Sequence, residues 1–455
     1  MSTDFEEWIN RQYIKPKGKM TAMSELHQVF LSMVPKEENR GGESWTTPAY
    51  ISTPRGHART RSEAQSIAQS SGGGGSYGTW TSTPGNATSS VEFSNREVAA
   101  SQGMSDSGFV AFAEAQKHKI EGLTEGFGSK MSRMILGPPG SFLFQAATIS
   151  NGVITLNSDY ADVIGLIEPG DQLQLSDEDG DEDNDALIGS GNIGYVIAVD
   201  PEGDSPTVTV ATSPGGSAAS PSDWEANATG FIYKLGEFKG GIDRGPNATN
   251  SQLVIDSVQA WLPPTTLTDT FKGVDRSVTS KLTGLRQTST DITSLDIEEC
   301  LEQMFVRGRQ RYGWKGGQKI FVNSVRFNQL SRSLETRRMR GMSEMKWERG
   351  GGESGNKAYA SFGYNKIALY ATNGSFEVID EPHMPADYAL ATDPSKWRVR
   401  SYEGFPQAVD KDSNRILRKS TDDDYEFRLA AYASFMLAAD GVISHSGRTA
   451  LPTAA

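Results

Sequence analysis

The stretch SLDIEECLEQMFVRGRQRYGWKGGQKIFVNSVRFNQLSRSL, residues 294–334, contains two helical patterns separated by a short apolar run. In the first pattern apolar side chains recur at three- to four-residue steps, as one face of a helix requires: Leu295, Ile297, Leu301, Met304 and Phe305. The run QKIFVN predicts a short buried strand, and SVRFNQLSRSLETRRM predicts a second helix. A helix, a strand and a helix on one side of a compact body indicate an α+β fold.

Capping residues mark the ends of both helices. Thr293 or Ser294 is predicted to cap the first helix, because hydroxyl side chains accept from free N–H groups there. Gly313 stands just past its end, where the left-handed conformation favours glycine. Asn323 or Ser324 is predicted to open the second helix.

A longer helix is predicted before this stretch, at 96–136. Apolar residues again recur at three- to four-residue steps: Phe109, Phe112, Ile120, Leu123 and Phe127. The sequence GPPG at 137–140 must end this helix, since two prolines cannot continue it.

Residues 41–95 are rich in Ser, Thr, Gly and Pro, with scattered aromatic residues. The segments TPAYIST and YGTWTST alternate as strands do, so we expect a long two-stranded excursion. About fifty residues without core-forming periodicity exceed the usual loop length, and such a segment is either disordered or ordered by another chain. The preceding residues 1–40 are expected to form an arm, with one or two helical turns before Pro35.

Residues 141–236 change to a period of two, which predicts a barrel or sandwich of five to seven strands. The acidic stretch SDEDGDEDNDA, residues 176–186, lies between two of these strands, as a hairpin tip would. With Gly180 at the sixth position of a calcium loop, Leu175 and Ala186 occupy the first and twelfth positions, so the bidentate ligand is missing. We expect a solvated acidic tip, with weak calcium adsorption as the alternative. The carboxylates that we assign to this surface tip are those of Asp177, Asp179, Asp181 and Asp183.

The C-terminal part predicts more strands. Residues 367–392 contain a hairpin with Asn373 and Gly374 at its turn, and residues 422–447 predict a strand-rich return.

Composition limits the classes of function. The 455 residues carry a formal net charge of −13, from 57 acidic and 44 basic side chains, which opposes indiscriminate binding to DNA or anionic membranes. No apolar run approaches the length of a membrane span, and the N-terminus has no secretory signal pattern, so we expect a soluble protein used where it is made. The single cysteine, Cys300, excludes an internal disulfide and is predicted to be a small core residue.

Motifs for catalysis are missing from the sequence. The five histidines are far apart, and no nucleophile elbow, phosphate loop or dinucleotide fingerprint is present; GSGNIG at 189–194 precedes a strand pattern, not a helix. We therefore predict no enzyme and assign no catalytic, cofactor or metal residue. The basic run RSLETRRMRG at 332–341 is either a solvated helix end or a patch that faces another subunit or DNA.

The order of these parts resembles the major capsid proteins of tailed bacteriophages, which have the HK97-like fold. The resemblance is carried by the extended loop, the long helix, the stretch at 294–334 in the position of the axial domain, and the segment RKSTDDDYEFRLAAYASFMLAADGVI at 418–443. In that last segment Asp424, Tyr425, Glu426 and Arg428 match the pattern of the final peripheral-domain strand.

The resemblance implies six segments. They are an N-terminal arm at 1–40, an extended loop at 41–95, a spine helix at 96–140, an inserted small all-β domain at 141–236, a mainly axial segment with part of the peripheral domain at 237–380, and a return through both domains to the C-terminal tail at 381–455. No long helical scaffolding segment precedes the arm and no lysine–asparagine crosslink pair can be assigned, so we expect a separate scaffolding protein and non-covalent locking.

The implied function is self-assembly into hexamers and pentamers of an icosahedral shell around phage double-stranded DNA. The implied partners are other copies of the chain, portal and scaffolding proteins, a decoration protein as an open alternative, and DNA held by weak non-specific contact, with assembly in the host cytoplasm and no membrane contact. Predicted inter-subunit contacts are Trp45, Tyr50, Arg55, Arg59, Arg61, Tyr77, Trp80, Arg337, Arg338 and Arg340. Two other functions remain open at this point: a nanocompartment shell that packages enzymes, and a secreted β-rich protein that binds or hydrolyses polysaccharide with its acidic loop.

Overall fold

The computed structural model of this chain describes most of its length. The described residues are 28–38, 41–52, 56–70, 75–94, 106–138, 142–177, 187–190, 192–201, 205–238, 255–263, 270–293, 295–315, 318–339, 366–371, 374–409, 416–418, 424–439 and 441–452. Within these residues no helix is both long enough and apolar enough to span a membrane.

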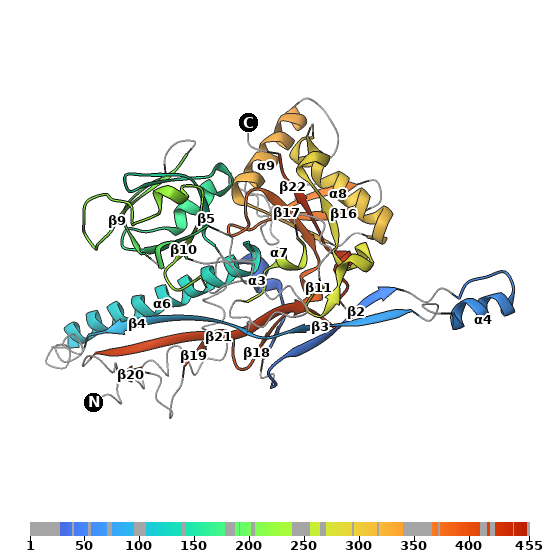
Figure 1. Ribbon diagram of the computed structural model, residues 1–455, viewed down its shortest axis with the longest axis horizontal. Coiled ribbons are helices and arrows are strands. Elements are labelled where there is room, and N and C mark those ends of the chain that lie inside the picture. The colour runs from blue at the N-terminus through green and yellow to red at the C-terminus, as the bar shows by residue number, and fades with distance from the viewer. Residues whose placement is uncertain are drawn as a thin grey trace, which may run out of the picture.

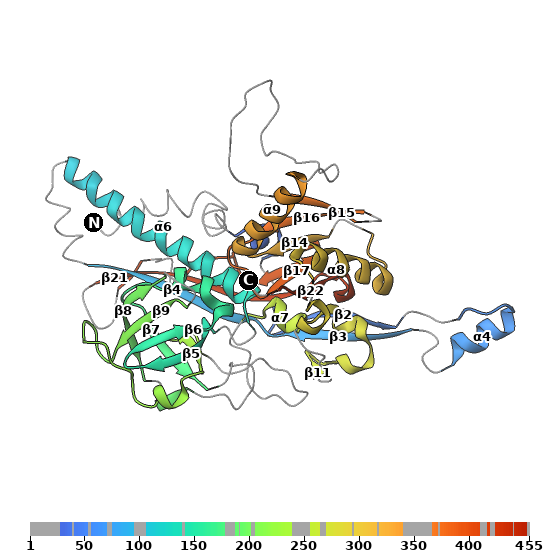
Figure 2. The same cartoon turned by 90° about the horizontal axis from the view of Figure 1, so that it is seen from above.

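A long twisted sheet forms the lower part of the molecule (Figure 1). Its central strand pairs with one strand along one edge and with three shorter strands along the other, and a short parallel strand extends the sheet. The strands are β21 (Tyr425–Leu437) at the centre, β4 (Gly85–Phe93), β18 (Trp397–Ser401), β19 (Gln407–Ala408), β20 (Ile416–Arg418) and β1 (Lys36–Glu37). The long helix α6 (Asp106–Leu136) runs beside β4 and β21 in both views (Figure 2).

A second six-stranded sheet is mixed parallel and antiparallel. Its order is β13 (Leu285–Gln287), β22 (Gly447–Ala450), β17 (Tyr388–Thr392), β14 (Lys319–Val322), β16 (Gly374–Asp380) and β15 (Lys366–Ala371). Helices α8 (Ile297–Tyr312) and α9 (Ser324–Met339) pack against it, so the helix, strand and helix predicted from 294–334 are confirmed.

The period-two region forms a closed barrel of six strands, within the predicted range. The barrel order is β10 (Phe231–Lys234), β5 (Phe144–Ser150), β6 (Val153–Leu156), β9 (Thr207–Ala211), β8 (Gly194–Asp200) and β7 (Gln172–Ser176), with the 3-10 helix η2 (Ser158–Leu166) between β6 and β7. It lies next to α6 in both ribbon views and has a hydrophobic core of its own.

Short elements connect these units. They are α3 (Val29–Met33), α7 (Val258–Trp261), β11 (Thr270–Phe271), β12 (Val274–Asp275), η3 (Ile188–Ser190), η4 (Glu225–Asn227), η5 (Arg276–Val278), η6 (Ser280–Leu282), η7 (Ser289–Ile292), η8 (Pro394–Lys396) and η9 (Ile443–His445). Helix α3 is the helical turn predicted before Pro35, and its Phe30 is fully buried in the main core.

The capping predictions are partly corrected. Helix α8 is capped by Asp296, which forms a capping box with Glu299, so the prediction of Thr293 or Ser294 is wrong. The carboxylate pair satisfies two free N–H groups at once, which a single hydroxyl cannot do. Gly313 adopts the left-handed conformation at φ 69°, as predicted, and Asn323 accepts from the Val325 N–H at the start of α9.

Cys300 lies in α8 and is fully buried, which confirms its predicted place in the core. Burial raises the pKa of its thiol to about 11, and nearby Glu299 and Asp296 add to this rise. The thiol is therefore protonated and unreactive at neutral pH.

Candidate assembly surface

A two-stranded hairpin that projects from the body occupies residues 45–82 of the excursion predicted at 41–95 (Figures 1 and 2). The prediction extends too far, because β4 (Gly85–Phe93) pairs with β21 and belongs to the long sheet of the body. Strands β2 (Trp45–Ser52) and β3 (Ser76–Ser82) pair antiparallel, with α4 (Arg61–Gln69) beyond them. Burial alternates along the inner half of both strands, because one face rests on the main core. The hairpin thus has an anchored base and a free distal half.

Aromatic packing anchors the base. Trp80 is 1% exposed, and its ring meets the rings of Trp261 and Phe271 edge to face, with centroids 5.3 and 5.9 Å away. Trp45 is 6% exposed and packs against Tyr402 at 5.2 Å. Both tryptophans were predicted to contact another subunit; in this structure their side chains fill the core of their own chain, and the predicted contact stays a prediction.

A buried ionic network fixes the same base. Lys272 Nζ lies 2.8 Å from Asp256 Oδ2, and these side chains are 3% and 0% exposed. Ser82 Oγ of β3 donates to the same carboxylate oxygen at 3.0 Å and lies 2.6 Å from Ser434 Oγ of β21. Four segments distant in sequence therefore meet at one charge pair, which fixes the direction in which the hairpin leaves the body.

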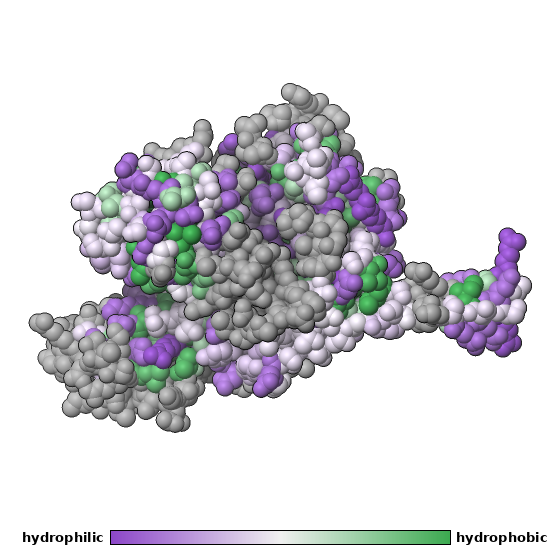
Figure 3. Space-filling view, viewed as in Figure 1, coloured by the Kyte–Doolittle hydropathy of each residue, from purple (hydrophilic) through white to green (hydrophobic). Residues whose placement is uncertain are grey.

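The distal half exposes apolar side chains. Tyr50 and Tyr77 are cross-strand partners, 42% and 60% exposed, with ring centroids 5.4 Å apart. Helix α4 buries none of its residues, and its Ile67 is 38% exposed. Figure 3 shows hydrophobic colouring among hydrophilic atoms at this far end. We call Tyr50, Tyr77 and Ile67 the distal apolar patch.

Two exposed arginines lie at the start of α4. Arg59 and Arg61 are exposed on either side of Thr60, which caps the helix by accepting from the Glu63 N–H. Arg55 and Arg340 lie outside the described residues, and Arg337 and Arg338 belong to α9 with side chains that are not described. The structure thus brings Tyr50, Tyr77, Arg59 and Arg61 onto one projecting element.

Sequence reasoning missed Ile67 and the ionic network. Ile67 is the one large apolar residue in RSEAQSIAQ, a signal that a helical reading of this segment would have found. Asp256 and Lys272 carry no local signal, because their pairing depends on a tertiary contact.

The acidic stretch connects β7 to β8, and these strands are antiparallel neighbours. Ser176 forms a bridge with Leu187, so the two ends of the stretch lie side by side as at a hairpin tip. Asp177 is exposed, whereas Asp179, Asp181 and Asp183 lie outside the described residues. Among the described side chains, no group of three or more His, Cys, Asp or Glu could hold a metal ion.

Comparisons give no family model and no curated protein that matches the sequence. Similar solved structures include the cyanophage A-1(L) capsid asymmetric unit, at 10% identity and TM-score 0.48, covering 93% of this chain and 92% of that chain. Mycobacterium phage Cain matches at 9% identity and TM-score 0.39, covering 94% and 92%. A virus-like particle from Pyrococcus furiosus matches at 7% identity and TM-score 0.34, covering 96% and 98%. Phage capsid structures are thus among those that this chain is similar to, as the sequence resemblance led us to expect.

Proposed function

We propose that this chain is the repeating subunit of a protein shell, and that it binds neighbouring copies through the β2–β3 hairpin. The observation that carries the proposal is the distal apolar patch on an element that projects from the body. The exposed tyrosine pair and the exposed isoleucine lie on the same projecting element, and covering their apolar surface with a neighbouring copy lowers the free energy.

The direction of the hairpin favours a head-to-tail contact. The hairpin leaves one side of the body, and we propose that the surface receiving it lies on the body of the next copy and not on that copy's hairpin. Such heterologous contacts close into rings when the rotation between copies permits it. Rings of six and five, assembled into an icosahedral head shell around phage double-stranded DNA, are the form we propose.

The buried network at the hairpin base supports this role. A projecting hairpin contributes to a stable interface only if its direction is fixed, since ordering on binding would cost affinity. Lys272, Asp256, Ser82 and Ser434 supply that fixation within the free subunit.

The charge of the chain fits a container for DNA. A net charge of −13 disfavours tight adhesion of the wall to a polyanion, so the packaged DNA stays releasable. We propose that portal and scaffolding proteins take part in assembly and that the acidic tip of the barrel faces outward, where a decoration protein or host surface can reach it.

Electron microscopy of the purified chain, with and without its scaffolding partner, tests the proposal. We expect closed shells or flat rings of five and six from the wild type, and at least tenfold fewer from Tyr50→Ser/Tyr77→Ser. Val153→Ser removes an exposed apolar residue on the barrel and is the matched control, expected to assemble normally. Small monodisperse particles from the wild type under both conditions would contradict the proposal. Shells that contain enzymes and protect no DNA from nuclease would identify a nanocompartment instead.

A further inference from the structure

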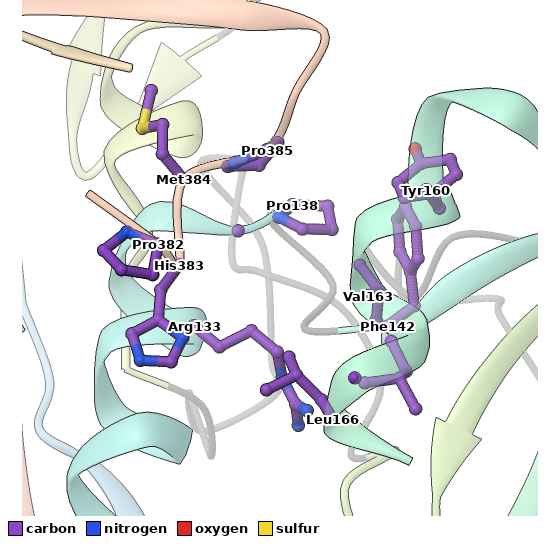
Figure 4. A pocket seen from close by; sticks show the side chains of 13 residues that line it. Arg133, Pro138, Phe142, Tyr160, Val163, Leu166, Pro382, His383, Met384 and Pro385 are labelled. Atoms are coloured by element: carbon purple, nitrogen blue, oxygen red, sulfur yellow. The ribbon is translucent and has the colours of Figure 1, made fainter. Parts of the chain in front are cut away.

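A pocket lies between the barrel and the body (Figure 4). It has a volume of about 200 Å³, and three elements contribute its walls: the end of α6, the entry and η2 of the barrel, and the loop 382–385. Apolar side chains line most of it, among them Phe142, Val163, Leu166 and Met384. A group bound here would touch the barrel and the body at once.

The rim of the pocket carries excess positive charge. Arg133 lines the pocket, and its side chain runs from α6 toward Leu166 in Figure 4. Its guanidinium lies 2.7 Å from Glu237 Oε2, while Lys130 Nζ lies 3.5 Å from Oε1 of the same carboxylate. One carboxylate therefore serves two cations, Arg133 in the pocket wall and Lys130 one helical turn before it on α6, so the three side chains together carry about one net positive charge beside the pocket.

The neighbouring acid, Glu381, does not neutralise this charge. Its carboxylate is fully buried and accepts from the backbone N–H of Phe30 at 2.6 Å and of His383 at 3.3 Å. The hydrogen bonds of this carboxylate thus run to α3 and to its own loop. Arg133 and Lys130 form their ion pairs with Glu237. The pocket thus suits an apolar group that carries a negative charge.

The N-terminal segment enters the described structure beside this pocket. Gln28, the first described residue, donates from Nε2 to Ser129 Oγ at 3.4 Å, and Ser129 lies one helical turn before Arg133. Phe30 is bonded to Glu381, the residue before the loop that forms the opposite wall. The chain therefore arrives between two walls of the pocket.

The sequence of that segment has the complementary chemistry. Residues 4–8 read DFEEW, two aromatic side chains among three carboxylates, with no basic residue before Arg11. Nineteen residues lie between Trp8 and Gln28, and these twenty steps span at most roughly 70 Å when extended, so reach is not limiting. A short tether also gives this segment a high effective concentration at its own pocket.

We propose that residues 4–8 of the chain bind in the pocket between its own barrel and body, with an aromatic side chain inserted and the carboxylates beside Arg133. Bound there, the segment acts as a wedge that fixes the barrel relative to α6. The interaction is formed within one subunit and does not depend on shell assembly.

Photocrosslinking of the full chain tests this proposal. Trp8→p-benzoylphenylalanine keeps an aromatic ring at position 8, and its ketone reacts with nearby C–H bonds on irradiation. We expect the crosslink in peptides from 160–166 or 382–385. Arg133→Gln should lower the crosslink yield several-fold, whereas Glu237→Gln, which releases both cations, should raise it; the distant Arg307→Gln should leave it unchanged.

Mixing isotope-labelled with unlabelled chain identifies which copy is bound. Crosslinks confined to one isotope would support the proposal. Mixed crosslinks would assign the occupant to a second copy and overturn it, as would crosslinks that miss the pocket. Circular dichroism of each variant checks that a lost crosslink does not reflect a lost fold.

Discussion

Glu381 shows how a single carboxyl group ties the N-terminal segment to the body. Burial raises its pKa to about 7, partly opposed by the backbone N–H groups of Phe30 and His383 and assisted by the charge of Asp380. The folded chain therefore holds a proton that the unfolded chain releases near pH 4.5. The free energy of unfolding consequently falls as pH rises from about 4.5 to about 7, by roughly 3 kcal/mol, and is level above that range.

The variant Glu381→Gln should remove this pH dependence, because its amide never ionises; its oxygen can still accept from the Phe30 N–H, whereas the longer hydrogen bond from the His383 N–H is lost. We expect the melting temperature of the variant to change less between pH 5 and pH 8 than that of the wild type. Glu403→Gln, at an exposed site, is the control and should follow the wild type at both values. Parallel pH profiles for Glu381→Gln and the wild type would show that Glu381 is not the titrating group.

Burial also decides how much the Lys272–Asp256 ion pair contributes to the stability of the fold. Lys272→Met leaves the Asp256 carboxylate buried without its cation, which we expect to cost about 3–5 kcal/mol of unfolding free energy. In the more exposed pair of Arg307 and Asp291, Arg307→Met should cost only about 0–1 kcal/mol. Urea unfolding of both variants measures the contrast, and equal losses would argue against a buried charge pair at the hairpin base.

At the scale of elements, helix α8 shows what the sequence can predict. Its apolar period, its end at Gly313 and its buried face were all readable, because the information lies within sixteen neighbouring residues. The N-cap was misplaced by two or three residues, since several adjacent residues could serve and only the capping box at Asp296 distinguishes them.

The hairpin region shows what the sequence cannot predict. Helix α4 buries no side chain, so it lacks the apolar stripe that reveals a helix. Strand β4 (GNATSSVEF) has a turn-like composition and is a strand because β21 pairs with its whole length. Trp45 and Trp80 point into the core because they pack against Tyr402 and against Trp261 and Phe271, respectively. These partners are far away in the sequence, so no local pattern contains that information.

Close packing between α8 and Trp314 leaves no room for a side chain at Gly308. A Cβ at Gly308 would lie 2.4 Å from the ring of Trp314, which is 1% exposed and cannot move away. Gly308→Ala should therefore destabilise the fold by about 1–3 kcal/mol, despite the better helix propensity of alanine. In α6, where nothing lies within 4 Å of a Cβ at Gly122, Gly122→Ala should stabilise by roughly 0.5–1 kcal/mol. Thermal unfolding of both variants tests the prediction, and a stable Gly308→Ala would mean that the ring can yield.

At the scale of the whole molecule, three hydrophobic cores support one projecting element. The main core joins α3, α6, the base of the hairpin and β21, the second lies between α8, α9 and their sheet, and the third fills the barrel. The distal hairpin belongs to none of these cores beyond its anchored base. Its conformation therefore contributes little to the stability of the subunit, and its apolar surface is available for contact between subunits.

Shortening the hairpin separates these two roles. Replacement of residues 53–75 by Asn-Gly would join the paired residues Ser52 and Ser76 through a two-residue turn and remove α4. Because α4 buries no side chain, we expect a change of at most a few degrees in melting temperature and at least a tenfold loss of shells in electron micrographs. Replacement of 178–186 by Gly-Ser-Gly shortens the acidic tip of the barrel and serves as the control, expected to leave both stability and assembly unchanged. Normal shells from the shortened hairpin would exclude α4 from the contact between copies and leave the retained pair of Tyr50 and Tyr77 to carry it. Loss of shells from the control alone would make the acidic tip the structural contact.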